Sequence, residues 1–375
     1  MDIATKILHT GAETDKYTGA VSIPIYQVST FDQKDELSQY EYSRSGNPTR
    51  EALESIIAQL EGGVAGFAFS SGMAAIAAVT LLFGNGDHLL APKDVYGGTY
   101  RILSKACGKW GISYSFVDTT DFEHLTQAVQ PNTKAIVLES PSNPLLKVSD
   151  LPKICAWAKE KGIITIVDNT FMTPYLQRPI EFGADIVVHS ATKFLGGHSD
   201  VIAGLVVAGN KELANQIGFL QNTLGGVLGP QDSWLTMRGI KTLKVRMDFA
   251  QQGALKIAQA LTKHPKVKHV FYPGLPDDPG HQLLQSQADG FGAVLSFELQ
   301  TPDLARQLMK KVKYPAVAVS LGGVESILSY PATMSHASVP PQVRADLGIS
   351  DALLRLSVGL ESPADIIEDL LAALE

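Results

Sequence analysis

Cysteine is scarce in this sequence, and its scarcity excludes two classes of protein. Only Cys107 and Cys155 occur among 375 residues, too few for the disulfide framework of a small secreted domain. The chain has no Cys-x-x-Cys pair and no His-Glu-x-x-His segment, and its nine histidines are scattered. We therefore predict neither a structural zinc site nor metal chemistry.

Charge is also scarce. Charged residues make up 18% of the sequence, compared with about 25% in a typical soluble domain. Lys and Arg total 31 and Asp and Glu total 38, which gives a net charge of −7. This mild acidity argues against binding of DNA or RNA through phosphate neutralisation. A chain of this size with so little charge is expected to bury part of its surface against another subunit.

Long apolar runs are absent as well. The longest, around residues 73–83, is too short to cross a bilayer and contains Thr80. The first ten residues lack an apolar stretch followed by a small-residue cleavage site, so no signal peptide is predicted. We expect a cytoplasmic protein that binds neither a membrane nor a nucleic acid.

Hydrophobic residues are plentiful, at 45% of the sequence, and at ~150 residues per domain the length predicts two or three units. Residues 1–47 are rich in Tyr, Ser, Thr, Gly and Pro without sustained periodicity. This composition predicts an irregular arm that lies on its own domain or on a partner. We predict a large α/β domain over residues 48–245 and a smaller C-terminal α/β domain over residues 246–375.

The large domain is predicted as a doubly wound, mostly parallel sheet. Its strands read as near-continuous Ile, Val and Leu, the pattern of parallel strands that are buried on both faces. Thr49 is the predicted cap of one helix, and Ser149 that of another, which ends at Gly162. The predicted helices cover residues 50–61, 73–83 and 149–161, and the strands cover residues 88–91, 112–117, 135–138, 163–167, 185–188 and 203–207.

The smaller domain is predicted to follow a long helical stretch over residues 230–264. Gly239 marks a break within this stretch. Strands are then predicted over residues 267–272, 293–299, 316–320 and 354–358, with helices between them.

Polar side chains follow three of the strands predicted in the large domain. Residues 139–144 follow one strand, Asp168 and Asn169 follow the next, and residues 189–193 follow the third. In open α/β sheets, ligands bind at the carboxyl ends of parallel strands. The sequence therefore predicts a ligand site at these three strand ends.

Asp168 and Lys193 carry the most specific of these signals. They are 25 residues apart, the spacing of one strand end, a crossover helix and the next strand end. Such a carboxylate and amine suit pyridoxal phosphate, because the amine forms a Schiff base with the aldehyde and the acid keeps the pyridine nitrogen protonated. A buried Asp–Lys ion pair explains the same pattern, and both interpretations stay open at this point.

A phosphate site is predicted at the start of the Ala-rich helix. Gly72 and Met73 offer backbone N–H groups at the positive end of the helix dipole, and the hydroxyls of Ser190 and Thr192 flank the same site as Lys193. Alternatively, Gly72 serves only a tight turn between strand and helix. No Gly-x-x-x-x-Gly-Lys-[Ser/Thr] loop and no Gly-x-Gly-x-x-Gly segment follows the first strand, so nucleotide binding loses its main support.

Two further side chains are candidates for the site. Tyr96 follows the end of a strand, where it is a candidate to stack on an aromatic ring, although an ordinary core tyrosine fits the pattern too. Arg355 lies inside an apolar strand, and an unpaired buried charge is costly. Its partner is either a substrate carboxylate, bound in bidentate fashion, or a protein carboxylate such as Glu325.

Five segments of the sequence are especially specific. They are Tyr42-Ser-Arg-Ser-Gly-Asn-Pro-Thr49, Ser70-Ser-Gly-Met-Ala-Ala75, Val167-Asp-Asn-Thr170, Ser190-Ala-Thr-Lys-Phe-Leu-Gly-Gly-His198 and Ser320-Leu-Gly-Gly323. Their order along the chain is hard to obtain by chance. With these segments the sequence resembles, over essentially the whole chain, the transsulfuration family of pyridoxal-phosphate enzymes, the cystathionine synthases and lyases.

The resemblance implies a pyridoxal-phosphate-dependent transferase-like α/β fold, the aspartate aminotransferase type or fold type I, with pyridoxal 5′-phosphate as cofactor. Lys193 would be the Schiff-base lysine and general base, and Asp168 the partner of the pyridine nitrogen. Tyr96 would stack on the cofactor ring and assist proton transfer.

The resemblance also implies how the phosphate is bound. The backbone amides of Gly72 and Met73 would hold it together with the hydroxyls of Ser190 and Thr192.

Further residues are implied to act across subunits or on the substrate. Tyr42 and Arg44 would reach the phosphate of a neighbouring subunit, so the arm over residues 1–47 would contact that neighbour in a homotetramer, a dimer of dimers. Arg355, Ser320 and Asn143 would bind the carboxylate of an amino-acid substrate.

Three positions bear on the choice of activity within the family. Val319 stands where synthases and γ-lyases often carry glutamate, and Leu321 stands where some bacterial β-lyases carry tryptophan. Gly98 replaces the cysteine that is usual in methionine γ-lyases. The sequence as a whole most resembles the Gram-positive members of the family, and this resemblance is clearest at residues 24–30 and 225–234.

We expect a cystathionine γ-lyase that converts cystathionine to cysteine, 2-oxobutyrate and ammonia. The alternatives are a cystathionine β-lyase, which forms homocysteine, pyruvate and ammonia, and then a cystathionine γ-synthase. Two hypotheses from other classes are a nicotinamide dehydrogenase and a binding protein without a cofactor. The sequence lacks the glycine-rich motif that a nicotinamide dehydrogenase would carry.

Overall fold

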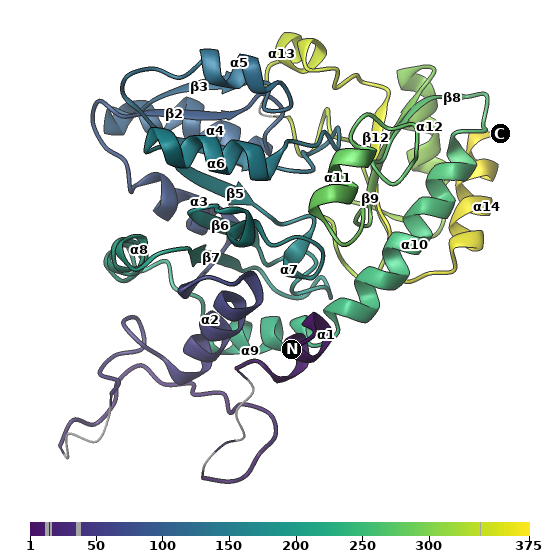
Figure 1. Cartoon of the computed structure of the whole chain (residues 1–375). Helices are drawn as coiled ribbons and strands as arrows, with labels where there is room; N and C mark the ends of the chain where they lie inside the picture. Colours follow the sequence, from purple (N-terminus) through teal and green to yellow (C-terminus); the bar gives the residue numbers. More distant parts are fainter. Residues whose placement is uncertain (12–14, 16, 35–38, 338) are drawn as a thin grey trace. The chain divides into compact units, whose positions relative to one another are not determined.

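The computed structural model describes residues 1–11, 15, 17–34, 39–337 and 339–375. The chain divides into two compact units, Met1–Phe83 with Ile164–Lys244 and Gly84–Ile163 with Val245–Glu375 (Figure 1). Each unit is built from two separate stretches of the chain. Parts of the predicted arm, at residues 12–14, 16 and 35–38, lie outside the described residues. The domain boundaries after residues 47 and 245 stay a prediction.

Four strands form the sheet of the first unit, in the order β1-β7-β6-β5. β5 and β6 are parallel, whereas β7 runs antiparallel to both β6 and β1. The Ile- and Val-rich strands β5, β6 and β7 begin and end within two residues of the predicted ranges. The four strands are β1 (Ala65–Phe69), β5 (Ile164–Asp168), β6 (Ile186–Ser190) and β7 (Gly204–Ala208).

β1 is not among the predicted strands, because its sequence is rich in small residues rather than β-branched ones. A Cβ added at Gly66 would lie 2.2 Å from the backbone oxygen of Glu54 on the neighbouring helix α2. Glycine therefore lets α2 pack directly on the strand, and the feature that weakens the strand signal is the one that the packing requires.

Helices cover the strands of the first unit. α2 packs on β1 and on α9, α8 packs on β1, and α3 packs on β6 and β7. The predicted helix over residues 73–83 begins one residue earlier and ends at Thr80. The helices are α1 (Ile3–His9), α2 (Pro48–Glu61), α3 (Gly72–Thr80), α7 (Thr173–Leu176), α8 (Lys211–Leu224) and α9 (Pro230–Ile240).

Asn47, and not Thr49, caps helix α2, so the predicted cap is wrong by two residues. The Oδ1 atom of Asn47 accepts hydrogen bonds from the backbone nitrogens of Thr49, at 3.0 Å, and Arg50, at 3.4 Å. Pro48 fits the first helical position because it has no N–H group to satisfy. The Thr49 hydroxyl instead accepts from the backbone of Tyr26 and donates to that of Pro24, so it ties down the preceding segment.

The second unit contains a parallel three-stranded part in the order β4-β2-β3. Its helix α6 is capped by the carboxylate of Asp150, which accepts from the backbone nitrogen of Lys153 at 3.0 Å, and not by Ser149 as predicted. Gly162 ends the helix in the left-handed conformation, as predicted. The elements are β2 (His88–Pro92), β3 (Ser113–Val117), β4 (Thr133–Glu139), α4 (Gly97–Lys105), α5 (Phe122–Gln127) and α6 (Leu151–Lys161).

The second unit also contains a five-stranded sheet in the order β10-β11-β12-β9-β8, antiparallel except between β10 and β11. β11 is not among the predicted strands, and β10 is shorter than predicted. The strands are β8 (Val267–Phe271), β9 (Val294–Leu299), β10 (Ala316–Val317), β11 (Ile327–Ser329) and β12 (Leu353–Ser357).

Helices and the five-stranded sheet enclose a core that includes Leu295, Phe297, Leu354 and Leu370. The helical stretch predicted over residues 230–264 breaks between α9 and α10. Within the described residues, none of the helices combines the length and the apolarity that crossing a bilayer requires. The helices are α10 (Leu243–Leu261), α11 (His281–Gln287), α12 (Pro302–Lys311), α13 (Pro341–Asp346) and α14 (Pro363–Leu374).

Candidate active site

The start of helix α3 lies against the end of strand β6. A Cβ added at Gly72 would lie 2.9 Å from the Cβ of Ser190, so only glycine allows this approach. Ser71 caps the helix by accepting a hydrogen bond from the backbone nitrogen of Ala74 at 3.1 Å. The first N–H groups of a helix have no partner within it, which leaves the amides of Gly72 and Met73 suited to an anion.

Lys193 lies in the turn that follows β6. Its backbone nitrogen donates to the oxygen of Ser190 at 3.1 Å, and its oxygen accepts from Gly197 at 2.7 Å. The Thr192 hydroxyl donates to the oxygen of Ala203 at 3.2 Å and accepts from the nitrogen of the same residue at 3.0 Å. The hydroxyl hydrogen of Thr192 thus points at the backbone oxygen of Ala203. The role of this hydroxyl at a phosphate stays a prediction.

The Asp168 carboxylate ends strand β5 and is held by Thr170. Its Oδ1 atom accepts hydrogen bonds from the backbone nitrogen of Thr170 at 3.1 Å and from the Thr170 hydroxyl at 2.5 Å. Burial raises the pKa of Asp168, while these hydrogen bonds and the interaction with His189 oppose the rise. Sequence reasoning missed Thr170, although it closes the Val167-Asp-Asn-Thr170 segment.

A buried polar group joins α2 to the ends of β5 and β6. The Oε1 atom of Glu61 lies 2.7 Å from the Nε2 atom of His189 and accepts from the Nδ2 atom of Asn169 at 2.9 Å. These three side chains are almost wholly inaccessible to solvent. Glu61 thus fixes the two residues that adjoin Asp168 and Ser190. Sequence reasoning missed this role, because the three residues come from distant segments.

Tyr42 and Arg44 lie on an exposed turn that precedes α2. The Tyr42 side chain is 46% exposed, and the Arg44 guanidinium lies 5.6 Å from the centre of its ring. Arg44 also donates from one nitrogen to the backbone oxygen and the Oδ1 atom of Asn222, at 2.8 and 2.7 Å. The structure thus brings the two predicted residues together at the surface of the first unit.

In the second unit, Arg355 on β12 is only 2% exposed. It donates to Oδ1 of Asn143 at 2.9 Å, to the backbone oxygen of Ser320 at 2.7 Å and to the hydroxyl of Ser329 at 3.2 Å. Burial lowers the pKa of Arg355 to about 10, while Glu139 opposes this effect. The guanidinium is therefore charged at neutral pH. The structure brings together the three residues predicted to bind a carboxylate.

The surroundings of Arg355 contain two further signs of a binding site. Ser320 has a φ of 91°, a conformation that side chains other than glycine rarely adopt and that is typical of functional sites. The Nε atom of Arg355 is buried without a hydrogen-bond partner in the described part of the chain. A buried donor of this kind is costly unless a ligand satisfies it.

Tyr96 and His336 lie in the same unit. Tyr96 precedes helix α4, is 38% exposed and donates from its backbone nitrogen to Oε2 of Glu139 at 3.0 Å. The exposed ring is available to a ligand and is not a core tyrosine. His336 is buried, and burial together with the charge of Arg355 lowers its pKa to about 4. His336 is thus neutral at physiological pH; sequence reasoning missed it.

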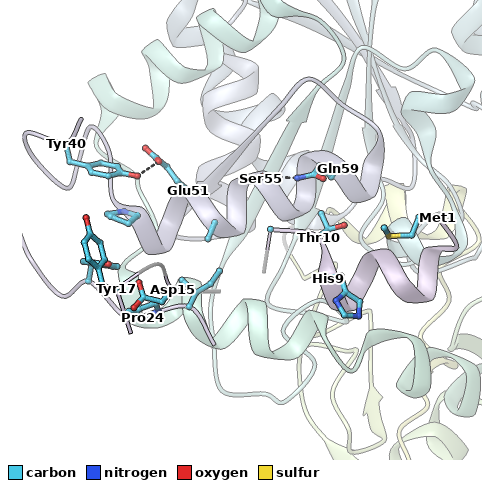
Figure 2. Close-up of a pocket in the computed structure, with 15 residues that line it drawn as sticks. Met1, His9, Thr10, Asp15, Tyr17, Pro24, Tyr40, Glu51, Ser55 and Gln59 are labelled. Carbon is cyan, nitrogen blue, oxygen red and sulfur yellow. Dashed lines mark hydrogen bonds between the residues drawn. The ribbon is translucent and has the colours of Figure 1, made fainter. Parts of the chain in front are cut away.

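A separate cavity of about 670 Å³ lies along the outer side of α2 in the first unit, and Figure 2 shows the residues that line it. The Tyr40 hydroxyl donates to Oε2 of Glu51 at 2.6 Å beside this cavity, and burial together with Glu51 raises the pKa of Tyr40 to about 12. None of the predicted site residues is among its lining residues. This cavity is therefore not the predicted site.

The whole chain is similar to solved structures of pyridoxal-phosphate enzymes. It matches the cystathionine γ-lyase of Lactobacillus plantarum complexed with L-serine with a TM-score of 0.96 and 46% identity, over 100% of this chain and 98% of that one. It matches a cystathionine γ-synthase from Xanthomonas oryzae pv. oryzae in complex with cystathionine with a TM-score of 0.97 and 43% identity, over the same shares. The fold is therefore that of fold type I pyridoxal-phosphate-dependent enzymes, as predicted.

Residues 4–375 match the family described as Cys/Met metabolism PLP-dependent enzyme, and the chain belongs to this family. It is 55% identical over 375 residues to a cystathionine β-lyase of Lactococcus lactis subsp. cremoris (strain MG1363), covering 100% of this chain and 99% of the relative. It is 53% identical over 373 residues to a cystathionine γ-lyase of Bacillus subtilis (strain 168), with 99% and 98% covered. Membership confirms pyridoxal phosphate as the cofactor and excludes the nicotinamide and cofactor-free alternatives.

The residues of the first unit fit this cofactor. Gly72 permits the close approach of Ser190 to the start of α3 that a phosphate cradle needs. Burial raises the pKa of the Asp168 carboxyl, so a nearby positive charge would stabilise its ionised form, and a protonated pyridine nitrogen would supply such a charge.

Proposed function

We propose that this protein cleaves the carbon–sulfur bonds of cystathionine, with γ-elimination to cysteine, 2-oxobutyrate and ammonia as its main reaction. Relatives that are 55% and 53% identical over nearly the whole chain are named cystathionine β-lyase and cystathionine γ-lyase, which supports this substrate. The γ-lyase assignment is supported by Leu321, which differs from the tryptophan of some bacterial β-lyases.

The observation that carries the proposal is the buried guanidinium of Arg355. It is charged, it is held by Asn143 and by the strained Ser320, and one of its N–H groups has no partner within the described residues. A planar guanidinium binds a carboxylate in bidentate fashion. We therefore assign Arg355, Asn143 and Ser320 to the α-carboxylate of the substrate.

The residues of the first unit are assigned to the cofactor. Lys193 would hold it covalently through its amine, and Asp168 would accept a hydrogen bond from its protonated ring nitrogen. The amides of Gly72 and Met73, with the hydroxyls of Ser190 and Thr192, would hold its phosphate. Of these groups, the Thr192 hydroxyl must turn away from Ala203 before it donates to a phosphate.

When bound, pyridoxal phosphate supplies an acceptor for the electron pair that remains when the α-carbon loses its proton. Once the amino group of the substrate has replaced the Lys193 amine on the cofactor, the freed Lys193 amine would act as the general base that removes that proton. Loss of sulfur from the β-carbon needs no further proton removal, whereas loss from the γ-carbon also requires a proton to leave the β-carbon. Lys193 would therefore serve both carbons in γ-elimination. Tyr96 would stack on the cofactor ring and assist the proton transfers.

β-Elimination is the second candidate, since two Lactococcus lactis relatives named cystathionine β-lyase share 55% identity with this chain over its whole length. Incubation of the purified enzyme with cystathionine, followed by identification of the keto acid, separates the two. We expect mainly 2-oxobutyrate, whereas mainly pyruvate would establish β-elimination instead. Lys193→Ala should abolish both products and the visible absorbance of the holoenzyme.

We further propose a cytoplasmic homotetramer, a dimer of dimers, in which residues 1–47 contact a neighbouring subunit. Tyr42 and Arg44 would then reach the phosphate bound by that neighbour. The exposure of both side chains on one turn supports this assignment. Light scattering of the holoenzyme measures the mass of the assembly directly.

A further inference from the structure

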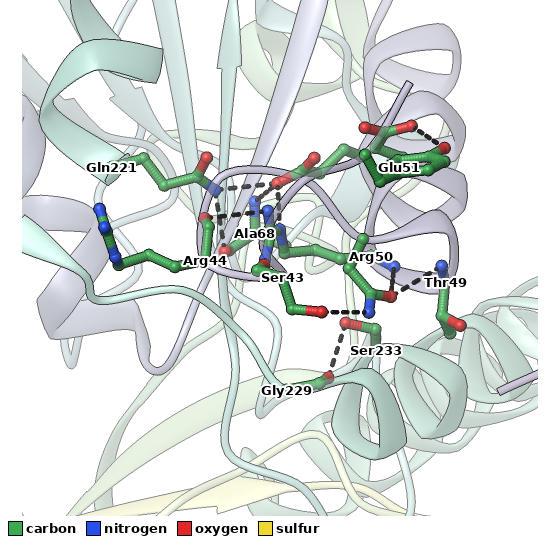
Figure 3. Close-up of polar contacts among 12 residues, drawn as sticks. Ser43, Arg44, Thr49, Arg50, Glu51, Ala68, Gln221, Gly229 and Ser233 are labelled. Atoms are coloured by element: carbon green, nitrogen blue, oxygen red, sulfur yellow. Dashed lines mark hydrogen bonds and ion pairs between the residues drawn. The ribbon is translucent and has the colours of Figure 1, made fainter. Parts of the chain in front are cut away.

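The turn that carries Tyr42 and Arg44 is held from its buried side by a second arginine. Arg50, in the first turn of α2, is only 2% exposed. It donates from one terminal nitrogen to the backbone oxygen of Ser43 at 2.6 Å and from the other to that of Arg44 at 3.2 Å. Figure 3 shows the Arg44 side chain extending away from this buried group. A single guanidinium thus binds two successive carbonyls of the turn.

The third nitrogen of Arg50 faces Glu54, one helical turn further along α2. The Nε atom of Arg50 lies 3.4 Å from Oε1 of Glu54. The same oxygen accepts from the backbone nitrogen of Ala68 and from the side chain of Gln221, both at 2.8 Å. Burial raises the pKa of Glu54 and the charge of Arg50 opposes this. Glu54 thereby ties Arg50 to β1 and to α8.

A second set of bonds holds the same turn from the start of α2. The Nδ2 atom of Asn47 donates to the Ser43 hydroxyl at 3.0 Å and to the backbone oxygen of Tyr26 at 2.9 Å. The Ser43 hydroxyl in turn donates to the backbone oxygen of Val28. These bonds fix Ser43, but Arg50 is the group that fixes the carbonyl of Arg44 itself.

The buried charge of Arg50 and the largely buried charge of Glu54 are an unusual way to hold a surface turn. Desolvating two charges is costly, and apolar side chains often stabilise a structure equally well. A paired guanidinium differs from an apolar side chain in one respect. It fixes the orientation of two carbonyls, and with it the direction in which the side chain of Arg44 leaves the backbone. Precise orientation matters where a side chain must meet a phosphate.

We propose that Arg50, paired with Glu54, is a positioning residue that orients the turn of Tyr42 and Arg44 for binding the phosphate of pyridoxal phosphate. This inference rests on the proposed function, which assigns that phosphate contact to Tyr42 and Arg44. Arg50 itself is buried and acts only through the turn.

The test compares ligands with and without a phosphate. Purified holoenzyme is stripped of its cofactor and titrated with pyridoxal phosphate or with pyridoxal, and binding is followed by visible absorbance. We expect Arg50→Gln to bind pyridoxal phosphate about 10- to 100-fold more weakly, which is the effect of losing one hydrogen bond to a charged group. The affinity for pyridoxal should stay unchanged. Arg306→Gln, at an exposed ion pair with Asp303, is the matched control and should alter neither.

The double variant decides whether Arg50 acts through Arg44. Arg44→Ala should weaken the binding of pyridoxal phosphate, and adding Arg50→Gln should weaken it further only through Tyr42, so the two losses should be clearly less than additive. Arg50→Lys, which retains the charge but not the two-pronged donor, should restore only part of the affinity. If Arg50→Gln does not fold, as judged by circular dichroism, Glu54→Gln replaces it with a smaller expected loss of the same selectivity.

The inference is overturned if pyridoxal and pyridoxal phosphate bind equally more weakly to Arg50→Gln, or if the losses in the double variant are additive. It is also overturned if Arg50→Gln binds pyridoxal phosphate with wild-type affinity while Arg44→Ala binds it more weakly. An unchanged affinity in Arg44→Ala also overturns it, since the turn then makes no phosphate contact. Failure of the proposed function gives a different result. In that case wild-type protein releases no keto acid from cystathionine, whatever the Arg50 variants bind.

Discussion

Thr170 holds the carboxylate of Asp168 with two hydrogen bonds, and its replacement by valine tests what the hydroxyl contributes. Valine has nearly the same shape, so Thr170→Val removes the 2.5 Å bond from the hydroxyl and keeps the 3.1 Å bond from the backbone nitrogen. A hydrogen bond to a charged group contributes about 1.5–3 kcal/mol, which corresponds to roughly a 10- to 150-fold change in an equilibrium constant.

The direction of the effect follows from the pKa of Asp168. Burial raises this pKa, and the Thr170 hydrogen bonds oppose the rise. Removing the hydroxyl raises the pKa further, because the ionised form loses a donor while burial is unchanged. The ionised carboxylate, which exists above the pKa, then disappears at a higher pH as the solution is acidified. Affinity for pyridoxal phosphate should therefore begin to fall at a higher pH in Thr170→Val than in the wild-type protein.

The assay is a titration of the cofactor-free enzyme with pyridoxal phosphate at a series of pH values, followed by visible absorbance. At neutral pH we expect weaker binding for Thr170→Val, by at most roughly 150-fold, because the energy of the lost hydrogen bond bounds the change in the ionisation of Asp168. Thr170→Ser is the control, because it retains the hydroxyl that also accepts the backbone N–H of Ser190 at 2.9 Å. A Thr170→Val protein with the wild-type affinity and pH profile would refute the reasoning.

Two further predictions concern the substrate site and the buried polar group. Arg355→Lys keeps the charge but loses the two-pronged donor, so steady-state kinetics should show KM for cystathionine raised at least about tenfold with a smaller change in kcat; an unaltered KM would contradict the assignment. Glu61→Ala leaves His189 and Asn169 without their shared acceptor, so urea unfolding should show stability lowered by about 2–6 kcal/mol, at ~1–3 kcal/mol for each unsatisfied donor. Glu181→Ala, at an exposed ion pair, should cost less than about 1 kcal/mol, and equal losses in the two variants would count against the burial argument.

The strands with runs of Ile and Val, such as β5 and β7, were predictable because their apolar pattern is itself the cause of their burial. β1 was not predictable, because Gly66, which lets α2 pack directly on the strand, carries no strand signal. The choice between Asn47 and Thr49 as helix cap was also beyond local rules. Both residue types cap helices well, and only the path of the preceding segment, which binds the Thr49 hydroxyl, decides between them.

The candidate site was predictable in its kinds of residue but not in its pairings. A buried arginine in β12 implies a partner of some kind. That Arg355 finds Asn143, 212 residues away, depends on the fold of the second unit and not on any local pattern. The same holds for Glu61 and His189, which are 128 residues apart. Glu61 reads as an ordinary helix-end residue until its neighbours are known.

The division of the chain into two units has a consequence for how substrate preference can change. Lys193, Asp168 and the residues at the start of α3 belong to one unit, whereas Arg355, Asn143 and Ser320 belong to the other. On the proposed assignments, substitutions in the second unit would alter how the substrate is bound, while Lys193, Asp168 and the start of α3 would keep their local hydrogen bonds. This separation suits a fold whose similar proteins include a β-lyase, a γ-lyase and a γ-synthase.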